Sequence, residues 1–152
     1  MKSKVAFAAL AACLGAGFVL DAMAQAKPDV LVKQRKAAMT LIAKYWGPMG
    51  GMAQGKVPFN AQVVQRNSGY LETLAKMPWD GFDASTKGEK SAALPAVWEK
   101  PGEFKQAQER LENETAKLAQ VAKGGDEAAI KAQMGAVGKA CGGCHESFRE
   151  KQ

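Results

Sequence analysis

Several residue types are scarce in this 152-residue sequence, and each scarcity excludes a class of protein. Three cysteines are too few for a small scaffold held together by disulfides. Sixteen glycines and six prolines are too few for a low-complexity chain, and a hydrophobic fraction of 47% excludes a disordered one. The basic residues form no run of five or more, so we expect no nucleic-acid partner. The length suits a single domain.

The first 24 residues have the pattern of an export signal. Lys2 and Lys4 precede an apolar stretch from Val5 to Leu20, and Ala22-Met23-Ala24 supplies the small residues of a cleavage site. The apolar stretch is short for a membrane-spanning helix and is followed at once by that site. We therefore predict cleavage after residue 24, a mature domain of residues 25–152 in the periplasm, and no membrane span.

Leu10-Ala11-Ala12-Cys13 offers an alternative, because these residues look like the cleavage box of a lipoprotein. Only about five apolar residues precede the box, which is below the roughly 7–15 of an ordinary signal core. We favour the downstream site, which removes Cys13. The mature chain then keeps only Cys141 and Cys144, and next to them stands His145, the single histidine of the sequence.

The mature chain is predicted to be almost entirely helical. Apolar residues recur at steps of three and four in four stretches, which begin near residues 28, 60, 101 and 126. Asn60 and Asp126 are of the residue type that caps helix N-termini, and Gly124-Gly125 ends the third stretch. Short turns at 55–59 and 124–125 favour helix pairs. These features together predict an all-α, antiparallel four-helix bundle.

The segment from Pro78 to Pro101 loses the helical period and forms a long loop between the second and third helices. Loops of this length are usually functional or disordered. Trp79, Phe82 and Trp98 favour an ordered loop, and we interpret these aromatic side chains as packing rather than chemistry.

Cys141-Gly142-Gly143-Cys144-His145 has the spacing of covalent c-type haem attachment. On a helix the two cysteines lie on one face, where each can form a thioether with one vinyl group of the porphyrin. His145 can then ligate the iron, and the two glycines let the macrocycle approach the backbone. We predict one covalently attached haem c per chain.

Three other interpretations of the cysteine pair fit the sequence less well than haem attachment does. A disulfide between Cys141 and Cys144 would close a loop too small to contribute much stability. A redox dithiol of the thioredoxin kind belongs in a βαβ context, which the sequence does not predict. A zinc ion needs about four protein ligands, and the mature chain offers only three soft ones.

The position of this motif near the end of the last helix gives the chain a resemblance to the cytochrome c′ family, the four-helix class II cytochromes c. Shorter matches occur in the same order: Arg-Lys-Ala-Ala-Met at 35–39, Gly-Lys-Val-Pro-Phe at 55–59, Leu-Ala-Lys-Met-Pro-Trp at 74–79, and Leu-Pro-Ala-Val-Trp at 94–98. The resemblance implies a haem at one end of the bundle, with Cys141 and Cys144 as its thioether positions and His145 as the proximal ligand.

The resemblance also implies roles for three basic residues. Arg149 matches an arginine beside the proximal imidazole, and Arg35 matches a first-helix arginine near the haem propionates, where a guanidinium pairs well with a carboxylate. Lys36, within the same match, is expected to contact the haem. The alternative is that either arginine is an ordinary solvated charge.

Met39, one turn beyond Arg35, is our candidate for the sixth position of the iron. The single histidine already has a role, and of the five mature methionines Met39 lies on the apolar face next to Arg35. In the family this position carries either a bulky apolar residue that crowds an open iron or, in low-spin relatives, a methionine ligand. The alternative is that Met39 is simply a core residue.

These features predict a one-electron carrier rather than an enzyme, because the chain supplies no general base beyond His145. A net charge of about +5 on the mature chain would steer an anionic redox partner, whose identity the sequence does not give. The alternative is a gas-binding protein, since many members of the family resemble sensors or scavengers of nitric oxide. Family members often pair through their first two helices, which implies a homodimer.

Overall fold

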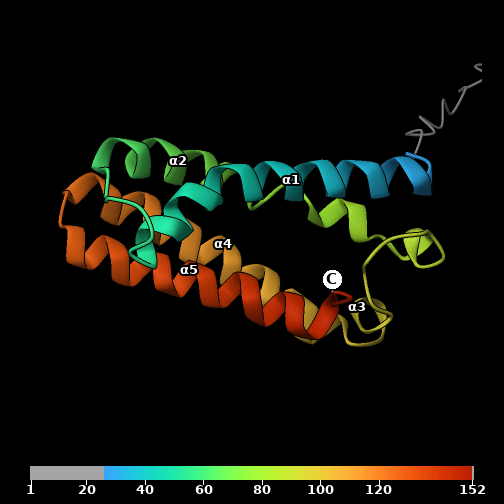
Figure 1. Cartoon of the computed structure of the whole chain (residues 1–152). Helices are drawn as coiled ribbons and strands as arrows, with labels where there is room; N and C mark the ends of the chain where they lie inside the picture. Colours follow the sequence, from blue (N-terminus) through green and yellow to red (C-terminus); the bar gives the residue numbers. More distant parts are fainter. Residues whose placement is uncertain (1–25, 152) are drawn as a thin grey trace, which may run out of the picture.

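The computed structural model describes residues 26–151, and the regular structure in that range is helical. Four long helices form an antiparallel bundle (Figure 1): α1 (Pro28–Ala53), α2 (Ala61–Leu74), α4 (Pro101–Gly124) and α5 (Glu127–Phe148). The predicted all-α four-helix bundle is therefore confirmed. The predicted export signal lies outside the described residues. None of the helices in this range is long and apolar enough to cross a membrane.

Three helix ends form where the sequence predicts them. The side chain of Asn60 accepts a hydrogen bond from the Val63 amide at 3.0 Å, and that of Asp126 accepts one from the Ala129 amide at 3.0 Å. Gly125 has φ 76°, in the left-handed region that favours glycine, and ends α4. A left-handed residue followed at once by a capping residue turns the chain tightly from α4 into α5.

α1 continues through Pro48 and past the two glycines that follow it, as far as Ala53. A proline inside a helix removes one backbone hydrogen bond and normally kinks or ends the helix. Here the last turns of α1 carry Met49 and Met52, which are both buried in the core. Tertiary packing of these side chains therefore outweighs the local preference to stop.

Two apolar clusters fill the bundle, and Cys141 packs against both. The main cluster draws on all four long helices and includes Ile42, Met49, Val64, Leu71, Leu118, Ile130, Met134 and Val137. A smaller cluster of Ala75, Leu111 and Ala140 lies beside Trp79. Cys141 is partly buried, whereas Gly142, Gly143 and His145 are exposed. The haem motif therefore begins in the packed bundle and continues to its surface.

The long connection between α2 and α4 is ordered, as predicted, and contains the short helical segments η1 (Trp79–Phe82), η2 (Ala84–Thr86) and α3 (Ala96–Glu99). The aromatic side chains of this connection pack against one another and against Phe104 of α4. The Trp79 and Phe82 ring centroids lie 6.1 Å apart, and the Phe82 and Phe104 centroids lie 4.9 Å apart. The indole of Trp98 donates a hydrogen bond to the Phe82 carbonyl at 3.0 Å. These contacts agree with the predicted packing role.

Candidate haem site

α5 carries both cysteines of the motif as free thiols. Cys141 and Cys144 are partly buried, form no disulfide, and share one face of the helix because they are three positions apart. Burial raises the pKa of the Cys141 thiol, and burial together with the neighbouring Cys141 raises the pKa of Cys144 to about 11. Both thiols are therefore protonated at neutral pH.

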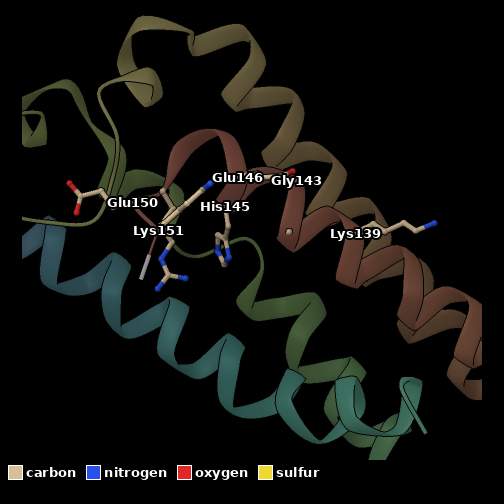
Figure 2. A pocket seen from close by; sticks show the side chains of 8 residues that line it. Lys139, Gly143, His145, Glu146, Glu150 and Lys151 are labelled. Carbon is tan, nitrogen blue, oxygen red and sulfur yellow. The ribbon is translucent and has the colours of Figure 1, made fainter. Parts of the chain in front are cut away.

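His145 lines a surface cavity of about 610 Å³ beside the end of α5. Figure 2 shows its imidazole pointing away from α5 and toward α1. Partial desolvation and the positive charge of Arg149 lower the pKa of the imidazole. The ring is therefore neutral at pH 7, the state in which an imidazole nitrogen ligates a metal.

Gly142 and Gly143 keep one wall of this cavity open. A Cβ atom built on either glycine would have no heavy atom within 4 Å, apart from its own stretch of helix. Neither glycine has a positive φ, so backbone conformation does not require glycine at these positions. What the two residues provide is bare backbone, which a planar group can approach closely.

Arg149 follows α5 directly and lines the same cavity as His145. Its backbone is extended, with φ −130° and ψ 139°, and its amide donates a hydrogen bond to the His145 carbonyl at 3.2 Å. The structure thus brings together the two residues that the family resemblance assigns to the proximal side of a haem.

Arg35 is only 3% exposed and points into the long loop, so the alternative of a solvated surface charge is wrong for this residue. Its Nη1 donates hydrogen bonds to the Gly81 carbonyl and, at 2.9 Å, to Thr86 Oγ1. Its Nη2 donates to Ser91 Oγ at 2.7 Å. The guanidinium carbon lies 4.6 Å from the ring centroid of Phe82, a cation–π distance.

Within residues 26–151 no carboxylate forms a salt bridge with Arg35. Burial lowers the pKa of the guanidinium, but the ordinary pKa of arginine is so high that the group keeps its positive charge. A guanidinium has five N–H groups, and three of those on Arg35 are used in the loop. Those that remain suit an anionic group such as a haem propionate. Arg35 does not line the cavity beside His145.

Lys36 is joined to the same loop. Its side chain is exposed, and its Nζ donates a hydrogen bond to the Lys90 carbonyl at 3.2 Å. It does not line the cavity beside His145 either. The structure therefore places Lys36 at the surface, next to the loop that Arg35 holds.

Met39 is partly buried and packs against the main apolar cluster, as Cys141 does. One turn further along α1, Ile42 belongs to the same cluster. Met39 therefore lies on the inward face of α1. It does not line the cavity beside His145.

These residues fit a covalently attached haem. Two free thiols can attach it, a neutral imidazole can ligate its iron, and two glycines leave space beside the backbone. A buried arginine without a carboxylate partner can offset the charge of a propionate. Within the part of the chain that the structure describes, no three His, Cys, Asp or Glu side chains gather to hold a metal ion.

The sequence did not reveal the loop partners of Arg35. Gly81 and Ser91 lie 46 and 56 residues further along the chain, and no local pattern connects them to α1. One signal was available in the isolated glycine at position 81. A Cβ atom there would lie 2.5 Å from Arg35 Cβ and 2.8 Å from the Leu31 carbonyl oxygen, so only glycine fits.

Comparisons with known proteins agree with this geometry. The family model described as Cytochrome C' matches residues 30–149. A cytochrome c′ from Rubrivivax gelatinosus is 43% identical over 126 residues, which cover 82% of this chain and 98% of the relative. A cytochrome c-554 from Cereibacter sphaeroides is 38% identical over 125 residues, covering 80% of this chain and 81% of the relative.

Solved structures are similar over the same range. Cytochrome c prime from Shewanella frigidimarina gives a TM-score of 0.78 at 33% identity, covering 82% of this chain and 97% of that one. The nitric oxide complex of a mutant cytochrome c prime from Alcaligenes xylosoxidans gives a TM-score of 0.76 at 35% identity, covering 84% and 98%.

Proposed function

Because the chain belongs to the cytochrome c′ family, we propose that it is a periplasmic haem c protein that carries single electrons. When bound, the haem supplies an iron that alternates between the ferric and ferrous states. The observation that favours a carrier is the position of Met39, whose thioether lies on the inward face of α1 and packs against the same cluster as Cys141. A second axial ligand there would saturate the iron.

Each residue of the site has one role in this proposal. Cys141 and Cys144 hold one haem per chain through thioether bonds, and His145 ligates the iron from the α5 side. Arg149 places a positive charge beside the imidazole. Arg35 and Lys36 lie on the side of α1 that faces the long loop and offset the negative charge of the propionates.

Electron transfer requires none of these side chains to move a proton, and we assign the chain no catalytic reaction. Ligation by sulfur raises the potential of the iron and closes its sixth position. A moderately positive surface favours encounter with an anionic redox partner.

Visible spectra of the ferric and ferrous holoprotein at neutral pH test the ligation directly. We expect a low-spin spectrum from the natural sequence and a high-spin spectrum from Met39→Leu, which keeps the volume but removes the sulfur. Met77→Leu is the matched control, because Met77 is 54% exposed and belongs to neither apolar cluster. A high-spin spectrum from the natural sequence would contradict the carrier.

Nitric oxide binding is the second candidate function. It is supported by the solved nitric oxide complexes of the Alcaligenes xylosoxidans protein, to which this chain is 35% identical. Titration of the ferrous holoprotein with nitric oxide separates the two functions. Slow binding that becomes fast in Met39→Leu supports the carrier, whereas fast binding by the natural sequence supports the gas-binding function.

The proposal includes a homodimer formed through α1 and α2. Both helices expose apolar side chains, including Leu41 on α1 and Tyr70 on α2, and the rings of Tyr45 and Tyr70 pair across the two helices at 4.8 Å. Analytical ultracentrifugation of the holoprotein tests the assembly. A single monomeric species at micromolar concentration would overturn it.

Export is tested by mass spectrometry of the protein from a periplasmic extract. A mass equal to residues 25–152 plus one haem supports cleavage after Ala24. A lipid-modified chain beginning at Cys13 would support the lipoprotein alternative.

A further inference from the structure

Residues 91–94, which we call the strap, join the N-terminal part of α1 to the end of α5. On the α1 side, Ser91 Oγ accepts a hydrogen bond from Arg35 Nη2 at 2.7 Å. On the α5 side, the Leu94 amide donates to the Phe148 carbonyl at 3.0 Å. Figure 1 shows the long loop crossing from the α1 side of the bundle to α3 and the C-terminal end of α5.

The α5 end of the strap forms a small antiparallel bridge. Ala93 pairs with Arg149, and the Glu150 amide donates a hydrogen bond to the Ala92 carbonyl at 2.9 Å. This bridge holds Arg149 in an extended conformation directly after the last turn of α5. The bridge therefore fixes the direction in which the Arg149 side chain leaves the backbone.

One hydroxyl group links the two ends. Ser91 Oγ accepts from Arg35 Nη2 and also from the Ala93 amide at 3.3 Å, so it uses both acceptor positions of a hydroxyl oxygen. Residues 91–94 are partly buried, which shields these hydrogen bonds from solvent. A continuous series of contacts thus runs from the buried guanidinium of Arg35, through Ser91 and Ala93, to Arg149.

The start of this series is itself rigidly held. Arg35 is fixed by Gly81 and Thr86 as well as by Ser91, and its guanidinium lies against the Phe82 ring. The end of the series lies at the haem motif, because Arg149 lines the cavity beside His145 and its amide binds the His145 carbonyl.

We propose that Arg35 and Ser91 are positioning residues for the haem site, and that through the strap they hold Arg149 beside His145. The inference rests on the proposed haem c site and is independent of whether the iron carries electrons or binds gas. It gives Arg35 a second role beyond charge compensation at a propionate. In this proposal the two arginines act as one unit, joined through Ser91.

The test uses the holoprotein with Ser91→Ala, Ser91→Thr and the control Ser85→Ala, which removes an exposed hydroxyl from η2 of the same loop. Hydrogen exchange of the Leu94 and Glu150 amides reports whether the bridge is closed. In Ser91→Ala we expect exchange at both amides to accelerate about tenfold, the equivalent of one lost buried hydrogen bond. Ser91→Thr should restore the natural rate, and Ser85→Ala should leave it unchanged.

The reduction potential of the haem separates positioning from a merely structural role. A positive charge near the iron favours the ferrous state, so displacement of Arg149 in Ser91→Ala lowers the potential, in the same direction as Arg149→Gln. If Ser91 acts through Arg149, adding Ser91→Ala to Arg149→Gln causes no further shift. Faster exchange with an unchanged potential, or additive shifts in the double variant, would overturn the proposal. Absence of covalent haem from the natural protein would instead refute the proposed function.

Discussion

The packed interior of the bundle and the end that carries the haem motif are stabilised by different kinds of contact. The interior rests on apolar side chains that are almost completely buried, such as Leu118 and Ile130. The site end rests on hydrogen bonds from Arg35 and on a backbone bridge to Arg149. Apolar packing tolerates substitutions of similar volume, whereas hydrogen bonds depend on the position of individual atoms. Variants should therefore divide into those that lower stability and those that disturb the site.

The largest expected effect belongs to the attachment itself. Replacing Cys141 and Cys144 together by Ala should abolish haem-dependent peroxidase staining after denaturing electrophoresis, because only thioether bonds retain haem in SDS. Removal of Cys13 is the control and should leave the stain of the mature protein intact, since we predict that this residue is cleaved off. Staining that persists in the double variant would show that the haem is not held covalently by these cysteines.

Leu118→Ala tests the interior. Leu118 is 0% exposed, and truncating a buried leucine typically costs about 2–5 kcal/mol of unfolding free energy. Thermal or urea unfolding of the holoprotein measures the loss, and the visible spectrum of the folded fraction should not change. Val57→Ala, at a side chain that is 44% exposed, should cost much less. An altered haem spectrum in Leu118→Ala would show that the two regions are not separable.

Gly81→Ala tests the site end. The new methyl group would lie 2.5 Å from Arg35 Cβ, so η1 must move away from α1 and weaken the hydrogen bond from Arg35 to the residue 81 carbonyl. We expect a loss of about 1–3 kcal/mol, as for other overpacked sites, together with a change in the haem spectrum. Gly88→Ala is the matched control in the same loop, because a Cβ atom there meets nothing within 4 Å. Equal effects from both substitutions would contradict the close packing.

The smallest effect is expected at the turn between α4 and α5. Asp126→Ala removes the side-chain acceptor of the Ala129 amide and should cost about 1 kcal/mol of stability. Asp126→Asn keeps an oxygen acceptor and should retain most of that stability. Neither substitution should alter the haem spectrum, because the turn lies at the opposite end of α5 from the haem motif. Urea titrations of the three proteins measure the difference.

Local sequence features predicted the fold and the haem motif because local chemistry determines them. Caps at Asn60 and Asp126, the left-handed Gly125 and the spacing of Cys141 and Cys144 each depend on neighbours within a few residues. The contacts of Arg35 could not be found in the same way, because its partners lie 46–56 residues away. The bridge between Ala93 and Arg149 could not be predicted from the sequence either. It is formed by backbone atoms, which every residue has, so no side-chain pattern marks it.

The passage of α1 through Pro48 was another non-local outcome. Pro48 removes one backbone hydrogen bond from the helix, and the nearby Gly50 and Gly51 are weak helix formers. The helix continues because Met49 and Met52 are buried in the main apolar cluster, where they pack with side chains of the other three long helices. Such a result depends on the shape of the whole bundle, which local periodicity does not describe.

The burial of the two thiols also sets the order in which the holoprotein can mature. Thioether formation needs access to both sulfur atoms, and in the folded chain Cys141 and Cys144 are partly buried with raised pKa values. Packing of α5 therefore competes with haem attachment, and attachment should be faster on a chain that has not yet folded. Alkylation of the haem-free protein should accordingly be slower in buffer than in urea. Equal rates would show that maturation and folding can proceed in either order.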